Sequence, residues 1–237
     1  MSIDLSVVVL AYNEAENLEP VVLELLGELR ASGRSFELVV VDDGSTDATG
    51  TLADTLAARE PGVRVVHHGV NLGLGGGYRT GLREARGTLL TFFPADGQFP
   101  ATIITQFLPL AAAHDLVLGY LPERASSWVA KGLSLAERVL YRLLFGRFPR
   151  FQGIFMIQRR LIDEIPLVSE GRGWAIVMEL IVRAARGPYR ITSVPTECRP
   201  RRAGASKVQN ARTIVANLRQ VVALRRLIAT PAQTGPR

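Results

Sequence analysis

The chain has 237 residues, of which 47% are hydrophobic and 21% are charged; these values are typical of a globular protein and unlike those of a disordered chain. Polar residues interrupt every apolar run well before about 18 residues, so no transmembrane helix is predicted. The first ten residues lack the basic start and the small-residue cleavage site of a secretory signal, so we expect a cytosolic location.

The formal net charge is +6 at pH 7, and all basic residues except Lys131 and Lys207 are arginine. This balance favours an anionic partner, which could be nucleic acid, a phosphorylated ligand or an acidic membrane surface. Nucleic acid is disfavoured because aromatic residues are not interleaved with the basic ones.

The cysteine and histidine residues carry no functional prediction. Cys198 is the only cysteine, so it cannot form an internal disulfide, and we expect it to be a small buried apolar residue. The three histidines, His67, His68 and His114, lack the spacing of metal ligands.

Strands and helices alternate over the first hundred residues. Predicted strands are Leu5–Leu10, Phe36–Val41, Val63–His67 and Thr88–Phe93. The helices between them run from the N-cap Asn13 to Gly33, from Asp47 to Ala58 and from Gly77 to Ala85. This alternation predicts an α/β fold with right-handed crossovers and a mostly parallel sheet covered by helices on both faces.

Beyond about residue 120 the pattern changes. A helix is predicted over Val177–Ala185 and a strand over Arg190–Val194. Two amphipathic segments, Leu133–Phe148 and Val208–Ala229, carry arginines beside an apolar stripe. They could lie in a membrane interface, pack on the core or form a dimer contact. We expect one domain over residues 1–229, with a ligand-binding half at 1–120 and a second half at 121–229. The last residues, 230–237, are predicted to be a flexible tail.

Polar residues follow each of the four predicted strands, and the pair Asp42-Asp43 is the most informative. In α/β sheets ligands bind beyond the carboxyl ends of the strands. Turn chemistry explains Gly44 and makes Ser45 or Thr46 a cap for the next helix. It does not explain two adjacent carboxylates at the mouth of an apolar strand, where they repel each other. Paired acceptors there suit the N–H groups of a base and the hydroxyls of a ribose.

The glycine-rich stretch Asn71–Tyr78 resembles a dinucleotide fingerprint but fails it. A third glycine would be needed at Tyr78, and the stretch follows the third strand instead of the first. A glycine-rich loop that opens a helix still offers backbone N–H groups, such as that of Gly75, to a diphosphate, and Arg79 would add a charge. The alternative is a flexible turn.

Two further motifs suggest phosphate chemistry. Asp96-Gly97-Gln98 follows the fourth strand and could hold a divalent ion beside a diphosphate, although Asp-Gly is also a common turn. The segment Arg199–Lys207 packs four cations around a glycine ahead of a helix. Ser206 and the helix start would complete a phosphate site there, and a solvated basic loop is the alternative.

Taken together, these residues resemble the family 2 glycosyltransferases, and within them the dolichol-phosphate mannose synthase-like polyprenyl-phosphate glycosyltransferases. The matching stretches, in the family's order, are Val8–Asn17, Val39–Asp47, Asn71–Gly87, Ala95–Gln98 and Arg201–Lys207. The resemblance implies a GT-A fold with the nucleotide site at the carboxyl ends of the strands. It also implies transfer of a hexose, with mannose favoured, from a GDP- or UDP-sugar to a polyprenyl phosphate. The transfer would invert the anomeric centre and take place at the cytosolic face of a membrane.

The resemblance, together with the motifs above, also implies a role for individual residues. Nucleotide-sugar binding is expected from Ala11, Tyr12, Glu14, Asp42, Asp43, Gly75, Arg79 and Asp96. A divalent metal, Mg²⁺ or Mn²⁺, is expected on Asp96 with Gln98, which makes Asp96 the catalytic residue. Phosphates of donor or acceptor are expected on Arg201, Ser206 and Lys207. An anionic membrane surface and a homodimer are further expected contacts.

Two departures from the family pattern bear on catalysis. Pro94 stands where the family usually has the first aspartate of its fourth-strand motif. The aspartate expected before the segment Phe151–Phe155 falls near Pro149 or Arg150. An acceptor phosphate is largely ionised at neutral pH and needs no strong base, so a missing base is tolerable. A missing metal carboxylate should weaken the ion. The alternative hypothesis is a catalytically weak pseudo-glycosyltransferase that binds nucleotide-sugar or a partner protein.

Overall fold

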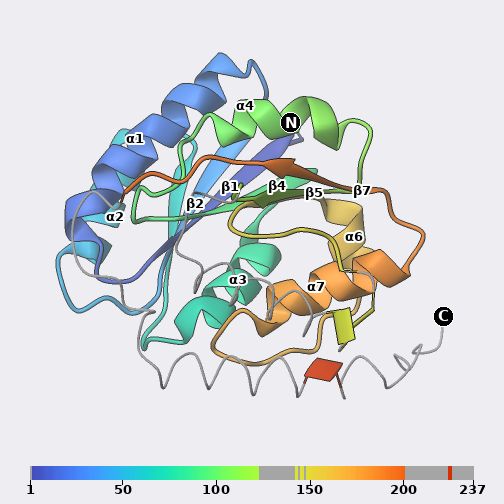
Figure 1. Cartoon of the computed structure of the whole chain (residues 1–237). Coiled ribbons are helices and arrows are strands. Elements are labelled where there is room, and N and C mark those ends of the chain that lie inside the picture. The colour runs from blue at the N-terminus through green and yellow to red at the C-terminus, as the bar shows by residue number, and fades with distance from the viewer. Residues whose placement is uncertain (1, 123–141, 144, 147, 201–223, 226–237) are drawn as a thin grey trace.

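The computed structural model describes residues 2–122, 142–143, 145–146, 148–200 and 224–225 (Figure 1). Its strands are β1 (Leu5–Ala11), β2 (Phe36–Asp42), β3 (Val63–His67), β4 (Leu89–Pro94), β5 (Leu116–Tyr120), β6 (Phe155–Gln158) and β7 (Ile191–Pro195). Its helices are α1 (Ala15–Ala31), α2 (Thr49–Arg59), α3 (Gly73–Glu84), α4 (Ile103–Ala111), α6 (Arg159–Glu164) and α7 (Ala175–Arg186).

The strands form one sheet in the order β3-β2-β1-β4-β6-β5-β7. Strand β6 is antiparallel to its neighbours β4 and β5, and the other pairs are parallel. The predicted mostly parallel α/β sheet is therefore confirmed. Because the parallel strands end at one edge, the loops that follow β1, β2, β3 and β4 come together there.

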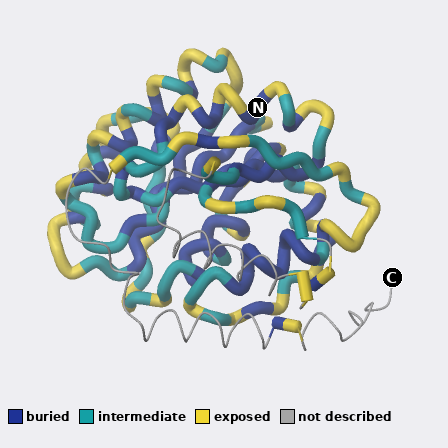
Figure 2. Tube along the Cα trace, in the orientation of Figure 1, coloured by how far each residue is buried: buried dark blue, intermediate teal, exposed yellow. Residues whose placement is uncertain are grey.

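Both faces of the sheet are buried, as a parallel sheet requires. Alternate side chains of β1 separate the two cores: Val7 and Val9 pack with residues of α1, α2 and α4, whereas Val8 packs with residues of α3 and α7. Figure 1 shows α1 and α4 on one side of the sheet and α3 and α7 on the other. The buried trace in Figure 2 follows the strands through the centre of the molecule.

The first three helices begin at different residues from those predicted. Asn13 is not the N-cap of α1: it adopts a left-handed backbone angle (φ 52°), and the helix starts after Glu14. Helix α2 starts at Thr49, because the carboxylate of Asp47 accepts a hydrogen bond from the Thr49 N–H at 2.9 Å. Helix α3 starts at Gly73, four residues before the predicted start, because the Asp43 carboxylate accepts hydrogen bonds from the amides at its beginning.

Four elements between residues 103 and 164 have no counterpart in the predictions: α4, β5, β6 and α6. Helix α4 contains Pro109 and a nearly continuous apolar sequence, so its periodicity is weak. Strand β6 has only four residues. The predicted helix over Val177–Ala185 and strand over Arg190–Val194 are confirmed as α7 and β7.

Several predictions concern residues outside the described ranges. They include most of the amphipathic segments Leu133–Phe148 and Val208–Ala229, the tail 230–237, and Arg201, Ser206 and Lys207. The division of the chain at residue 120 stays a prediction. Among the described helices, none combines the length and the apolar character that crossing a bilayer requires.

Candidate functional site

The predicted site residues of β1 and β2 lie side by side at the carboxyl edge of the sheet. Ala11, Asp42 and His67 are register partners on β1, β2 and β3 and form one row across the three strands. The pairing continues past the strand ends, because the Asp43 N–H donates to the Ala11 carbonyl at 2.8 Å. On the other side of β1, the Ala95 N–H donates to the Leu10 carbonyl at 3.0 Å. The loop that carries Asp96 is thereby joined to the same edge.

Hydrogen bonds join the loop after β1 to the loop after β2. They involve Asn13, Ser45 and Thr46, which the sequence suggested were helix caps. The Asn13 N–H donates to Ser45 Oγ at 3.0 Å, and Asn13 Oδ1 accepts from the Thr46 N–H at 2.8 Å. The Glu14 N–H donates to Thr49 Oγ1 at 2.8 Å. Asparagine tolerates the left-handed angle at position 13 better than most residues. These contacts hold Tyr12 and Glu14 beside the end of β2.

Asp42 is a buried carboxylate, with 7% of its side chain exposed. Its Oδ1 accepts from the Ser45 N–H at 3.1 Å, and its Oδ2 lies 3.0 Å from His67 Nδ1. Burial opposes ionisation, but the hydrogen bonds from Ser45 and His67 outweigh it, so the pKa of Asp42 is lowered from its ordinary value. A carboxylate offers about four lone-pair positions, and the contacts from Ser45 and His67 do not fill all of them, so Asp42 can still accept from a ligand.

Asp43 is arranged differently, because its carboxylate has four partners. Oδ1 accepts from the Leu72 N–H at 2.8 Å and lies 2.7 Å from His68 Nδ1. Oδ2 accepts from the Gly73 N–H at 2.8 Å and from Asn71 Nδ2 at 3.0 Å. Those contacts match the acceptor capacity of a carboxylate. Asp43 therefore fixes the β3–α3 loop and the start of α3.

His67 and His68, to which the sequence analysis gave no role, contact the two adjacent aspartates directly. They point to opposite faces of the sheet, as consecutive strand residues do. His67 bonds Asp42 and, through Nε2 at 3.0 Å, Asp54 of α2. His68 bonds Asp43 and, through Nε2 at 2.9 Å, Thr80 of α3. The signal available in the sequence was the pairing of two adjacent aspartates with two adjacent histidines at the ends of neighbouring strands.

The glycine-rich start of α3 packs against the segment 169–173. The Gly75 N–H donates to the Arg172 carbonyl at 2.8 Å, and a Cβ at Gly75 would collide with the carbonyl oxygens of Gly171 and Gly173. Arg79 donates to the carbonyls of Ser169 and Gly171 at 3.3 and 3.1 Å. The amide of Gly75 and the guanidinium of Arg79 are thus engaged within the chain, and their predicted contact with a diphosphate stays a prediction.

Segment 169–173 is itself anchored by a buried carboxylate of α7. Glu179 is fully buried, and its Oε2 accepts from the Ser169 N–H at 2.8 Å. Its other oxygen, Oε1, accepts from Arg183 Nε at 2.8 Å. Segment 169–173, which packs against α3, is therefore held in place by α7, although the two helices lie about a hundred residues apart in the sequence.

Asp96 lies in the turn after β4, where Gly97 has a φ of 72°. Its Oδ1 accepts from the Gln98 N–H at 3.1 Å, and the Gln98 carbonyl accepts from the Arg199 N–H at 2.7 Å. In the described part of the chain no three His, Cys, Asp or Glu side chains gather as a metal site. A single carboxylate with an adjacent amide fits a divalent ion that takes most of its ligands from phosphates and water. Pro94 supplies no further ligand.

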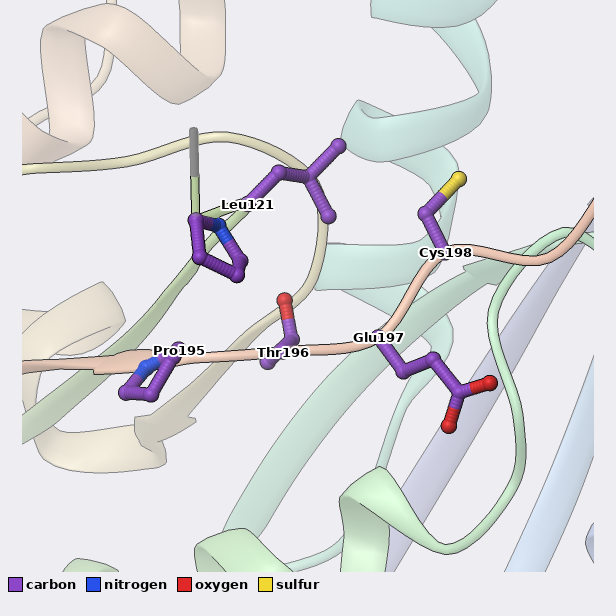
Figure 3. Close-up of a pocket in the computed structure, with 6 residues that line it drawn as sticks. Leu121, Pro195, Thr196, Glu197 and Cys198 are labelled. Atoms are coloured by element: carbon purple, nitrogen blue, oxygen red, sulfur yellow. The ribbon is translucent and has the colours of Figure 1, made fainter. Parts of the chain in front are cut away.

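A pocket of about 330 Å³ opens beyond the ends of β5 and β7, on the far side of β4 from Asp42 (Figure 3). Its lining residues are Leu121, Pro122, Pro195, Thr196, Glu197 and Cys198. The Thr196 hydroxyl points toward the segment that carries Leu121, whereas the Glu197 carboxylate points away from it. Cys198 is half-buried and lines this pocket, so the expectation that it is a small buried apolar residue is wrong.

Comparison with known proteins identifies the family to which the chain belongs. The model of the family described as glycosyl transferase family 2 matches residues 6–166. An undecaprenyl-phosphate mannosyltransferase of Micrococcus luteus is 32% identical over 210 residues, which cover 83% of this chain and 84% of the relative. A polyprenol monophosphomannose synthase of Mycolicibacterium smegmatis is 30% identical over 219 residues, with 86% and 81% covered.

A solved structure has a similar fold. Glucosyl-3-phosphoglycerate synthase from Mycobacterium tuberculosis, in complex with Mn²⁺, uridine-diphosphate and glucosyl-3-phosphoglycerate, matches with a TM-score of 0.67. The two sequences are 22% identical, and the match covers 92% of this chain and 80% of that one. The sheet and the helices on both its faces are those of the GT-A fold of glycosyltransferases. The chain belongs to glycosyl transferase family 2, and its relatives are of the dolichol-phosphate mannose synthase-like kind.

Proposed function

We propose that this glycosyltransferase moves a hexose, with mannose favoured, from a GDP- or UDP-sugar to a polyprenyl phosphate. The observation that carries the proposal is the similarity to the Micrococcus and Mycolicibacterium enzymes, whose names specify a polyprenyl acceptor and mannose. Each of these relatives is matched over more than four-fifths of its own length. The protein would act at the cytosolic face of a membrane, bound peripherally.

The nucleoside would bind at the row of strand ends. Asp42 has acceptor capacity for a base N–H or a ribose hydroxyl, and the interlocked loops hold Tyr12, Glu14 and Ala11 around it. Asp43 would contribute indirectly, because its four contacts fix the neighbouring loop. Gly75 and Arg79 would likewise shape the edge of the site through segment 169–173.

Sugar transfer would proceed by one displacement with inversion. An oxygen of the acceptor phosphate attacks the anomeric carbon, the bond from that carbon to the donor diphosphate breaks, and the electron pair leaves with the nucleoside diphosphate. The acceptor is largely ionised at neutral pH, so no residue has to remove a proton from it. This explains how the site could work with Pro149 and Arg150 in place of a carboxylate.

Asp96, with Gln98, would hold the donor diphosphate end of the site. A bound Mg²⁺ or Mn²⁺ would neutralise charge on the leaving diphosphate. The related fold crystallised with Mn²⁺ and uridine-diphosphate supports a metal in general. With Pro94 in place of a second carboxylate, we expect weak metal affinity.

The acceptor would approach from the side of β5 and β7. The pocket there lies beside the turn that carries Asp96, since Arg199, next to Cys198 of the pocket, bonds Gln98. Its lining is largely apolar, which suits the hydrocarbon part of a polyprenyl phosphate better than a sugar. Arg201, Ser206 and Lys207 follow this segment in the chain and would bind phosphate.

The proposal is tested by incubating the purified protein with radiolabelled GDP-mannose, UDP-glucose or UDP-N-acetylglucosamine, with Mg²⁺ or Mn²⁺ and a short polyprenyl phosphate. Label extractable into organic solvent is expected, most strongly with GDP-mannose. The matched variant Asp96→Asn should lose transfer while retaining its fold by circular dichroism. Nucleotide binding without lipid-extractable label from any donor would favour the pseudo-glycosyltransferase. Pro94, which replaces a carboxylate of the family motif, is the observation that supports this alternative.

Restoring the missing carboxylate tests the account of the metal. Pro94→Asp should raise the apparent affinity for Mn²⁺, measured as the Mn²⁺ dependence of transfer or of nucleotide binding. An unchanged Mn²⁺ dependence in a folded Pro94→Asp protein would contradict the role given to this turn.

A further inference from the structure

His67 lies between two carboxylates that belong to different elements. Its Nδ1 is 3.0 Å from Asp42 Oδ2 on β2, and its Nε2 is 3.0 Å from Asp54 Oδ1 on α2. Asp42 is buried, with 7% of its side chain exposed, whereas Asp54 is 66% exposed and lies outside the row of strand ends. The imidazole therefore connects the surface of α2 to Asp42, the acidic side chain of the row of strand ends.

This geometry favours the doubly protonated ring. An ionised carboxylate only accepts hydrogen bonds, so contact at both ring nitrogens requires a proton on each of them. The charged groups that the structure places against the ring are Asp42 from β2 and Asp54 from α2. Hydrogen bonds to Asp54 and then to Asp42 raise the pKa of His67 above its ordinary value, in spite of partial burial.

Close packing around the pair limits how Asp42 could rearrange. A Cβ at Gly50, in the first turn of α2, would lie 2.9 Å from Asp42 Oδ2 and 3.6 Å from His67 Cε1. Helix α2 thus approaches the Asp42–His67 contact as closely as a residue without a side chain allows. The position of Asp42 Oδ2 is set jointly by the ring and by the helix.

We propose that His67 is a positioning residue that orients Asp42 toward the nucleotide donor and makes donor affinity decrease as the pH rises. The proposal rests on the proposed contact between Asp42 and the donor. When the ring loses a proton, one nitrogen faces a carboxylate with its lone pair, and one charge-assisted contact is lost. The edge of the sheet also becomes more negative, which opposes the binding of a diphosphate.

The sign of the pH effect follows from the raised pKa. Because the folded-state pKa of His67 lies above the ordinary value of 6.5, the ring is protonated below that value and loses its proton as the pH rises through the folded-state pKa. Donor affinity should therefore be highest near pH 6.5 and decrease on the alkaline side. Losing a hydrogen bond to a charged group would cost more than about tenfold if the ring bound the donor directly. Because His67 acts on the donor only through Asp42, we expect a smaller decrease in affinity, of about threefold to tenfold.

The experiment measures binding of GDP and UDP by calorimetry, with Mg²⁺ present, between about pH 6 and 9. Asp54→Asn removes one carboxylate that raises the pKa of His67, so its decline in affinity should move to lower pH. Asp163→Asn removes an equal charge from an exposed position on α6 and should keep the wild-type midpoint. His67→Gln should bind the nucleotide at every pH with the weaker affinity that the wild type shows at alkaline pH. NMR titration of the imidazole resonances follows the same protonation directly.

The outcomes separate this proposal from the proposed function. Coincident midpoints for Asp54→Asn and Asp163→Asn, or a His67→Gln profile parallel to the wild type, would overturn the role of His67. If Asp42→Asn binds nucleotide as the wild type does, the donor contact of Asp42 itself is wrong. If a shifted midpoint in Asp54→Asn accompanies a lower imidazole pKa, the role of His67 is supported.

Discussion

At the scale of single residues, Asp42 and Asp43 are adjacent in the sequence and differ in what surrounds them. Within the described chain Asp42 bonds Ser45 and His67, which do not fill its roughly four acceptor positions, so it can accept a further hydrogen bond. Asp43 has four contacts, two of them with backbone amides at the start of α3. The same residue type therefore keeps acceptor capacity at one position and fixes loop geometry at the next.

Conservative substitution should separate these two roles. Asp43→Asn turns an N–H₂ group toward backbone amides that need an acceptor, so we expect a loss of stability of about 2 kcal/mol. Asp42→Asn should reduce nucleotide affinity more than it reduces stability. Urea unfolding and calorimetric titration with GDP and UDP measure the two quantities. Equal losses of stability in the two variants would contradict this division.

The sequence could predict that acidic residues gather at one edge of the sheet, but not which side chains they contact there. Asp42, Asp43, Glu14 and Asp96 all follow parallel strands, and the carboxyl ends of such strands meet at one edge. His67 and His68 received no role, because a histidine becomes informative only when its partners are known. Those partners come from strand register, which brings Asp42 opposite His67.

At the scale of elements, helix α3 shows why glycine-rich stretches are ambiguous. The glycine-rich sequence at its start is compatible with a diphosphate loop or with a flexible turn. In the described structure this stretch packs against the backbone of segment 169–173. Gly75 permits the backbone of α3 to touch the carbonyls of Gly171 and Gly173. Residues almost a hundred positions away set this requirement, so no local pattern could have predicted it. The early start of the helix depends on Asp43, which is also distant in the sequence.

A pair of glycine substitutions tests that contact. In Gly75→Ala the new methyl meets backbone atoms, which cannot move aside as a side chain would, so we expect a loss of about 1–3 kcal/mol. Gly27, within α1, has open space around its Cβ position, so Gly27→Ala should stabilise the protein by about 0.5–1 kcal/mol. Urea unfolding checks both values. A stabilising Gly75→Ala would show that segment 169–173 moves freely.

At the scale of the whole molecule, the sequence predicted the class of the sheet and its strand β7 but missed strands β5 and β6. The alternation of strands and helices predicted the first four strands. In their order, β3-β2-β1-β4, the consecutive strands β1, β2 and β3 are neighbours, as sequential strands usually are. Strand β6 breaks the rule by running antiparallel between β4 and β5. Long-range pairing of this kind leaves no periodic trace in a four-residue strand, so the sequence did not predict β6.

The charge of the whole chain leads to the last prediction, which concerns the membrane. With a net charge of +6, the protein should bind vesicles that contain phosphatidylglycerol and not vesicles of neutral phosphatidylcholine. Co-sedimentation should fall steeply when salt rises from about 0.05 M to 0.5 M, because the Debye length then shortens to a few ångströms. Release that is independent of salt would rule out an electrostatic attachment.

Two charge reversals test whether one face of the molecule makes that contact. Arg142 is exposed next to Leu143, an apolar side chain that is 72% exposed, and the nearby Phe145 packs against Met178 and Val182 of α7. Arg34 is equally exposed after α1, on the opposite side of the sheet. Arg142→Glu and Arg34→Glu lower the net charge equally. A cation at a membrane surface contributes about 1 kcal/mol, so Arg142→Glu should weaken vesicle binding at least fivefold more than Arg34→Glu. Equal weakening by both would mean that net charge alone attracts the protein, with no preferred face.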